Sequence, residues 1–132
     1  MNSTKQQPTE LEWEILQFIW QARKQVTVRE ILESAYPDGQ KAYTTVQTVM
    51  NNLVGKGYLN KEKVGLVNFY RPSEARDTTL RSAVTQMAKR FFGGSVNDLA
   101  NFLVDSDSLN EEELIRLKAL LEQKQKKESN NE

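Results

Sequence analysis

Residues 43–72 read YTTVQTVMNNLVGKGYLNKEKVGLVNFYRP, and this stretch decides the fold. Apolar residues recur at helical spacing in its first half, which predicts a helix that begins near Thr44 and is closed by Gly57. The segments 58–63 and 67–71 predict two short strands joined by a tight hairpin. A helix followed directly by a hairpin is typical of the second half of a winged helix-turn-helix domain.

Two more helices are expected before this stretch. Thr9 and Glu12 are spaced as a capping box, in which each side chain satisfies a backbone amide of the other residue, and apolar residues continue the helix to about Ala22. Thr27 and Glu30 repeat the box at the start of a second helix, after a segment long enough only for an edge strand. The order of helix, short strand, helix, helix, strand, strand is that of a winged helix-turn-helix.

The remaining residues, 73–132, are predicted to be helical. Apolar stripes over 80–91 and 96–103 are separated by a pair of glycines. Asn110 caps a last helix, whose polar end from Gln123 is expected to fray. The fold class is therefore mainly α with a small β wing.

We divide the chain into a winged-helix DNA-binding domain over 1–72 and a helical dimerisation domain over 73–132. Three helices of this length bury too little surface to be stable alone, so a second copy of the chain is the expected partner. A homodimer would hold two reading helices about one DNA turn, roughly 34 Å, apart or a multiple of it. The predicted dimerisation residues are Leu80, Val84, Met87, Phe91, Leu99, Leu103, Leu117 and Leu121.

The helix expected over 44–56 has an unusual outer face. Its inward arc is apolar, whereas its outer arc carries hydroxyls and amides and no charge. Solvent-facing helices favour Glu, Lys and Gln, because Thr and Asn are poor helix formers. Short hydrogen-bonding side chains suit a helix that reads bases in the major groove, where Gln and Asn pair with adenine and a threonine methyl touches thymine. The predicted DNA-binding residues of this helix are Thr44, Thr45, Gln47, Thr48, Asn51, Asn52 and Lys56.

The hairpin and the local charge support the same interpretation. The chain has 18 basic and 18 acidic residues, so its net charge is zero, but five of the basic residues and one acidic residue fall within 39–72. A local basic stripe matters more for DNA binding than the total charge. Lys61 and Lys63 on one strand and Arg71 on the other are predicted to contact phosphates. Lysines here would also protect an edge strand from aggregation.

The composition excludes several function classes. The sequence has no cysteine and no histidine, which removes the usual thiolate and imidazole groups of catalysis and the ordinary zinc and copper ligands. Neither an enzyme nor a bound metal or cofactor is expected. No run of about 18 apolar residues occurs, and the N-terminus lacks the apolar core of a signal peptide. A cytoplasmic protein without membrane insertion is predicted.

The chain resembles the penicillinase-repressor (BlaI/MecI) family of bacterial transcriptional repressors, within the BlaI/MecI/CopY superfamily, over about residues 8–122. The segments that carry the resemblance are TELEWEIL at 9–16, YTTVQTVMNNL at 43–53 and KGYL at 56–59. The resemblance implies a double-stranded DNA operator with dyad symmetry and TACA/TGTA-like half-sites, a helical dimerisation domain and control of antibiotic-resistance genes. It places the recognition positions on Thr44, Thr45, Gln47 and Thr48, with wing contacts near Lys61, Lys63 and Arg71.

The resemblance also separates branches of the family. In the beta-lactam branch, a membrane sensor metalloprotease cleaves an Asn-Phe bond and destroys the dimer, and Asn101-Phe102 matches that bond; the alternative is that Phe102 is simply a core residue. The copper-responsive branch uses a cysteine-rich tail, which this sequence lacks. The sequence departs from the beta-lactam repressors at 42–44, where Ala-Tyr-Thr replaces their usual Ser-Pro-Lys and a basic phosphate contact is lost.

Two other function classes stay open at this stage. A protein-binding winged helix would dock a partner on the helix over 44–56, and it would need a larger apolar outer face than this one. A regulator of similar fold would bind a small ligand between its helical and DNA-binding domains and release DNA without proteolysis. An enzyme is the least expected class, because the carboxylates within 105–113 cluster at a helix start, where capping and dipole effects explain them.

Overall fold

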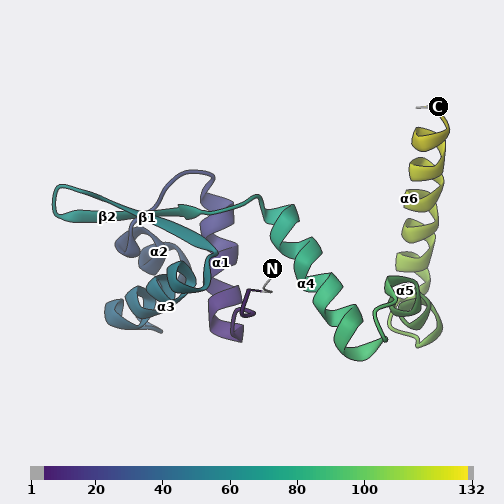
Figure 1. Ribbon diagram of the computed structural model, residues 1–132, viewed down its shortest axis with the longest axis horizontal. Coiled ribbons are helices and arrows are strands. Elements are labelled where there is room, and N and C mark those ends of the chain that lie inside the picture. Colours follow the sequence, from purple (N-terminus) through teal and green to yellow (C-terminus); the bar gives the residue numbers. More distant parts are fainter. Residues whose placement is uncertain (1–4, 131–132) are drawn as a thin grey trace. The chain divides into compact units, whose positions relative to one another are not determined.

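The computed structural model describes residues 5–130, and its elements follow the predicted order. Two antiparallel strands form the only sheet among these residues, and the rest of the regular structure is helical (Figure 1). The fold is therefore mainly α with a small β wing, as predicted. The elements are α1 (Glu10–Ala22), α2 (Val28–Ala35), α3 (Tyr43–Lys56), β1 (Leu59–Val64), β2 (Val67–Pro72), α4 (Arg76–Phe91), α5 (Val96–Asp105) and α6 (Glu111–Asn130).

The chain divides into two compact units, Met1–Ala83 and Val84–Glu132. The division falls inside α4. The boundary that we predict from the sequence lies earlier, directly after Pro72. The first unit contains the three helices and the hairpin of a winged helix-turn-helix. The second contains the end of α4 together with α5 and α6.

One hydrophobic core holds the first unit together. Helix α1 contributes Ile15 and Ile19 from the stripe that its periodicity predicts, and the hairpin contributes Tyr70. Figure 1 shows α2 and α3 beside α1, with the hairpin extending from this group of helices. Val26 exchanges two backbone hydrogen bonds with Tyr70, at 2.8 and 2.7 Å, so the predicted edge strand is a single bridge to β2. The fully buried side chains are Tyr70, Ile15, Leu16, Ile19, Ile31, Met50, Leu53, Leu59, Val26 and Val46.

The capping boxes predicted at Thr9 and Thr27 and the cap predicted at Asn110 are confirmed. Glu12 and Glu30 each accept a hydrogen bond from the amide of the threonine three residues earlier and donate their own amide to its hydroxyl. Asn110 and Glu113 make the same reciprocal pair at the start of α6. Local sequence alone thus sets the start of a helix in both units.

Two helix ends differ from the predictions. Helix α3 begins at Tyr43, and the N-cap residue Ala42 offers no side-chain hydrogen bond; its carbonyl instead accepts from the amides of Thr45 and Val46. Helix α6 continues to Asn130 instead of fraying from Gln123. Lysine, glutamine and glutamate are good helix formers, and each residue added to an existing helix gains one hydrogen bond.

The second unit buries few side chains of its own. Ala88 is buried and the rings of Phe92 and Phe102 lie 5.7 Å apart, but neither α5 nor α6 contains a buried residue over the described range. A glycine pair at 93–94 with positive φ separates α4 from α5. None of the described helices has both the length and the apolar character needed to cross a membrane.

Candidate nucleic-acid interface

Helix α3 presents the polar face that its sequence predicts. Val46, Met50 and Leu53 face the core and are fully buried. On the opposite side, the three residues Thr44, Thr48 and Asn52 are exposed, and Thr45, Gln47 and Asn51 are half-buried. None of these six side chains is charged, so the face offers hydrogen-bonding groups without repelling phosphate.

Asn51 joins this face to the hairpin. Its side-chain oxygen accepts hydrogen bonds from the Tyr70 hydroxyl at 2.9 Å and the Lys61 ammonium at 3.1 Å. Burial and the nearby Tyr43 raise the pKa of Tyr70, so its hydroxyl keeps the proton that it donates to Asn51. The sequence predicts DNA contacts for both Asn51 and Lys61; in the structure Asn51 holds the ammonium of Lys61 beside α3.

A hollow of about 310 Å³ lies between α3, the start of α2 and the hairpin. Gln47 lines it from α3, and the guanidinium of Arg29 lies 5.2 Å from the ring centre of Tyr43 on its other side. The hairpin closes the hollow with Leu66 and Asn68. Three separate elements therefore line the hollow beside Gln47.

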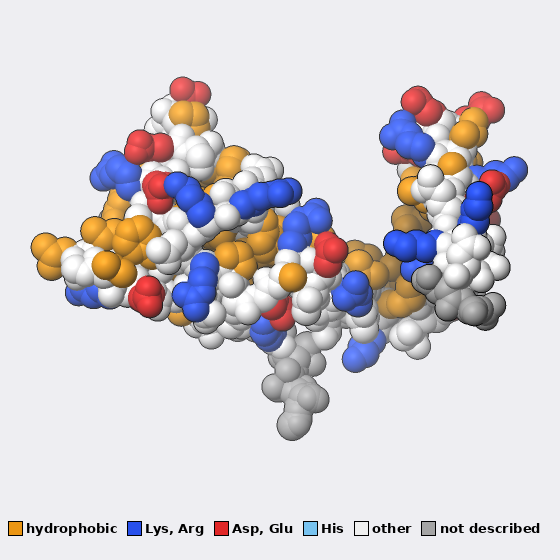
Figure 2. Space-filling model, turned by 90° about the horizontal axis from the view of Figure 1, so that it is seen from above, with side chains coloured by type: hydrophobic (Ala, Val, Ile, Leu, Met, Phe, Trp, Pro, Cys, Tyr) orange, Lys and Arg blue, Asp and Glu red, His pale blue; other side chains and the backbone are white. Residues whose placement is uncertain are grey.

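The apolar tip of the hairpin is the most exposed part of this region. Leu66 is 95% exposed, and Val64 and Val67 beside it are also exposed. In Figure 2 hydrophobic side chains gather at the free end of the first unit, where the hairpin turns. From the sequence this segment is expected only to be a turn, and in the structure its three apolar side chains are exposed together.

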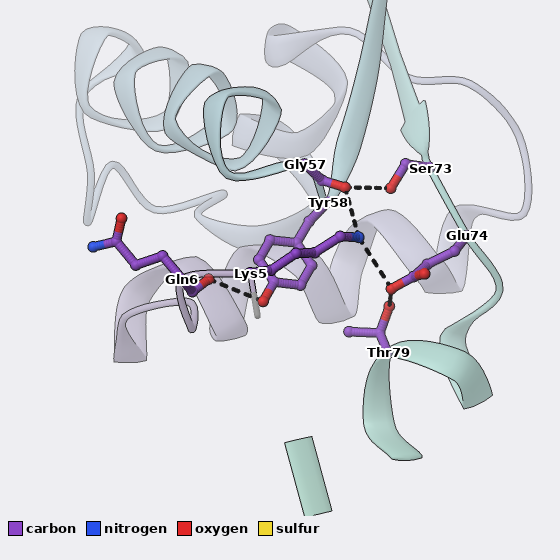
Figure 3. Close-up of polar contacts among 7 residues, drawn as sticks. All are labelled: Lys5, Gln6, Gly57, Tyr58, Ser73, Glu74 and Thr79. Atoms are coloured by element: carbon purple, nitrogen blue, oxygen red, sulfur yellow. Dashed lines mark hydrogen bonds and ion pairs between the residues drawn. The ribbon is translucent and has the colours of Figure 1, made fainter. Parts of the chain in front are cut away.

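The end of α3 is fixed by the chain that precedes α1 (Figure 3). The carbonyl of Gly57 accepts from the Lys5 ammonium at 2.9 Å and from the Ser73 hydroxyl at 2.6 Å, and the Tyr58 hydroxyl donates to the carbonyl of Gln6 at 2.9 Å. Gly57 has φ of 91°, which favours glycine, and a side chain there would also meet Lys5 at 3.4 Å. Lys5 and Gln6 thus close the last turn of α3.

The same lysine also pairs with Glu74, which lies just before α4. Its ammonium lies 3.3 Å from a carboxylate oxygen of Glu74, which also accepts from the Thr79 hydroxyl at 3.0 Å (Figure 3). Burial raises the pKa of Tyr58, and the charges of Glu74 and Glu12 act in the same direction, so this hydroxyl stays a donor.

Lys56, which the sequence predicts to contact DNA, forms an ion pair with Glu12 in the structure. Its ammonium is 2.5 Å from a carboxylate oxygen of Glu12, and the two side chains are only 14% and 4% exposed. Burial alone would raise the pKa of Glu12, but the hydrogen bond from Lys56 and the amide of Thr9 outweigh it and lower the pKa. We leave Lys56 out of the proposed interface, because this ion pair occupies its ammonium.

Arg71 lies apart from the other two wing residues. In the hairpin register Lys61 pairs with Tyr70 and Lys63 with Asn68, whereas Arg71 pairs with Asn60. Directly paired residues share a face, so the two lysines point to the face of Tyr70 and Arg71 points to the other. Arg71 lines a different hollow, with residues of α1 and α4.

Comparison with known proteins identifies the family. The family model described as penicillinase repressor matches residues 8–123, which is most of the chain. The chain belongs to the penicillinase-repressor family. The resemblance seen in the sequence is thereby confirmed.

Individual relatives are distant in sequence, and the two repressors named first cover most of the chain. The penicillinase repressor of Bacillus licheniformis is 26% identical over 117 residues, which cover 89% of this chain and 91% of that protein. The methicillin resistance regulatory protein MecI of Mammaliicoccus sciuri is 25% identical, over 86% of this chain and 91% of its own. A solution structure of monomeric Bacillus licheniformis BlaI with the blaP half-operator is 26% identical, with a TM-score of 0.47, and covers 56% of this chain and 89% of that one.

Sequence reasoning does not single out two residues that line the hollow between α3, α2 and the hairpin, Arg29 and Tyr43. Arg29 lies in the first turn of α2, where a cation is unfavourable because the helix dipole is positive there. That local conflict is the signal that could have singled it out. Tyr43 gives no comparable signal, because its place beside Arg29 depends on the packing of α2 against α3.

The predicted dimerisation residues lie on surfaces that the single chain leaves open. Val84, Met87, Phe91, Leu103 and Leu121 are exposed, and Phe91 is 67% exposed. The other three, Leu80, Leu99 and Leu117, are half-buried. Asn101 and Phe102 are both exposed and lie within α5, so the alternative that Phe102 is a buried core residue finds no support within the single chain.

Proposed function

We propose that this protein represses transcription by binding a dyad-symmetric DNA operator as a homodimer. Family membership makes it a DNA-binding repressor of the penicillinase-repressor type. The observation that carries the more specific proposal is the uncharged polar face of α3, flanked by Arg29 on α2 and by Lys61 and Lys63 on the hairpin. Such a protein acts in the cytoplasm and does no catalysis of its own.

The proposed roles divide into reading and positioning. Gln47 and Thr48 would contact base edges in the major groove, with Thr44, Thr45 and Asn52 beside them. Arg29, Lys61 and Lys63 would contact phosphates, which give affinity and register but no sequence information. Asn51 supports this arrangement by holding Lys61 against α3. All of these proposed roles fall on residues of the first unit.

A gel-shift titration at two salt concentrations tests these roles. Gln47→Ala should cost about 1–3 kcal/mol on the operator and little on random DNA, whereas Lys61→Ala should weaken both alike and flatten the salt dependence. Gln21→Ala and Lys124→Ala, at exposed positions in α1 and α6, are matched controls that should change neither. Equal losses on both DNAs for Gln47→Ala would refute base reading by this face.

The homodimer is proposed from the second unit. Many large apolar side chains of α4, α5 and α6 remain exposed in the single chain, and so much exposed apolar surface favours a protein partner. A second copy would cover the same faces and place the two α3 helices on successive half-sites. A light-scattering mass equal to one chain, 15.2 kDa, at micromolar concentration would refute the homodimer.

We further propose that a membrane sensor protease ends repression by cutting between Asn101 and Phe102. Both residues are exposed, and α5 buries no side chain in the described chain, so local opening of this helix costs little free energy. Mass spectrometry of the protein from beta-lactam-treated cells tests this. Fragments that end at Asn101 support the proposal, and an intact chain in cells whose target gene is induced contradicts it.

A further inference from the structure

A second hollow of the first unit, of about 490 Å³, has no part in the proposed DNA interface. It lies between the end of α1, the loop that follows it, the end of β2 and the first residues of α4. Ile19 and Trp20 form its apolar side together with Pro72 and Ala75. Its volume falls within the range of sites for small molecules, and an apolar wall with a few polar groups is their usual composition.

The rim of this hollow is strongly basic. Arg23, Lys24, Arg71 and Arg76 line it, against a single carboxylate, Glu74. That carboxylate is already engaged by Lys5 at 3.3 Å and by the Thr79 hydroxyl at 3.0 Å. In Figure 2 Lys and Arg side chains surround hydrophobic ones on the face of the first unit near the start of α4.

Three guanidinium groups of this rim are poorly compensated. No ion pair or hydrogen bond of the Arg23 or Arg71 side chain occurs among the described residues. Arg76 has only a long contact of 3.7 Å with the exposed Asp77, and its guanidinium lies 5.8 Å from the ring centre of Trp20. Lys24 differs from them, because it pairs with Glu30 at 3.1 Å.

The backbone fixes two of these arginines in place. Arg23 has φ of 55°, in the left-handed region that is unusual for arginine, and its amide donates to the carbonyl of Trp20. Arg71 lies in β2 on the face opposite Lys61, so it points away from the polar face of α3. Both side chains thus line a hollow that is separate from the hydrogen-bonding side chains of α3.

We propose that this hollow binds a small aromatic acid, either a carboxylate or a phosphate ester. Guanidinium groups of Arg23 and Arg71 would bind the acid group, since their planar forks match carboxylate and phosphate oxygens. The ring of the ligand would contact Trp20 and Pro72. The proposal goes beyond DNA binding and does not depend on it, although a DNA phosphate offers the same acid chemistry and must be distinguished.

Nuclear magnetic resonance of the full chain provides the test. The sequence contains two tryptophans, so the two indole N–H signals report on Trp13 and Trp20, and the variant Trp13→Phe assigns them. Benzoate, 1-naphthoate and phenyl phosphate serve as probes, with 1-naphthamide as the neutral counterpart. At least one acid should shift the Trp20 signal saturably at millimolar concentration, and the amide should not.

Two arginine variants separate the hollow from the DNA interface. Arg71→Gln should weaken binding of the acid about fivefold or more and leave operator affinity unchanged, whereas Arg29→Gln should do the reverse. An unchanged Trp13 signal and melting temperature show that each variant is folded. The proposal is overturned if no acid shifts the Trp20 signal, if the amide binds as well as the acid, or if Arg71→Gln weakens operator binding as Arg29→Gln does.

Discussion

The two units start their helices in the same way but differ in what they bury. Thr9, Thr27 and Asn110 each head a reciprocal capping box, the first two in the first unit and the third in the second. The first unit nevertheless packs one continuous core, whereas α5 and α6 bury no described side chain. Helix formation is thus encoded locally in both, but only the first unit supplies its own burial partners.

The largest effect is expected from the core of the first unit. Leu53→Ala removes a fully buried side chain of α3 and should lower the free energy of unfolding by about 2–5 kcal/mol, because it leaves a cavity. Urea unfolding followed by circular dichroism measures this loss. Leu66→Ala, at the exposed hairpin tip, is the matched control and should change stability by less than about 0.5 kcal/mol.

The second expected effect concerns association. Phe91→Ser should weaken the proposed homodimer by about 2 kcal/mol or more, because large aromatic residues dominate the binding energy of interfaces. Leu66→Ser, which is more exposed but lies in the other unit, should leave the dimer intact. Sedimentation equilibrium distinguishes the two, and an unchanged dissociation constant for Phe91→Ser would remove this face of α4 from the interface.

A third test uses the buried ion pair of the first unit. Lys56→Met should cost on the order of 2 kcal/mol near neutral pH, because it leaves the carboxylate of Glu12 buried without its partner. The pKa of Glu12 is lowered in the folded protein, so its contribution is present above its ordinary value of 4.5 and is lost as the pH falls through the lowered pKa.

The difference between Lys56→Met and the unchanged protein should therefore shrink in acid. Melting temperatures from pH 7 to pH 3 measure it, and Lys24→Met is the control, because its pair with Glu30 is largely exposed and contributes little. A difference that stays constant over this range would mean that the cost comes from lost packing instead of the lost charge pair.

The smallest expected effect compares one capping box in each unit. Thr27→Ala should cost the first unit about 1 kcal/mol, since one amide of α2 loses its acceptor. Asn110→Ala removes the equivalent acceptor from α6. Hydrogen exchange of the amides at the start of α2 and of α6 measures both losses of stability. Similar losses would confirm that the capping box stabilises the helix start in the same way in both units.

The sequence could predict the local features of the fold but not the contacts between residues that are far apart in the chain. The capping boxes and the buried stripe of α3 depend on residues within a few positions of one another, and they were predicted correctly. The pairing of Lys56 with Glu12 joins residues 44 positions apart, and no local pattern reveals it. The direction of Arg71 depends on the hairpin register, which fixes that it lies opposite Asn60.

The contacts of Lys5 and Gln6 with α3 also set an order of events during synthesis. These two residues leave the ribosome early, yet their acceptor and donor at Gly57 and Tyr58 follow 52 positions later. Lys5 and Gln6 therefore cannot make these contacts until α3 and the start of β1 have emerged. The last turn of α3 is therefore completed only after most of the first unit has been made.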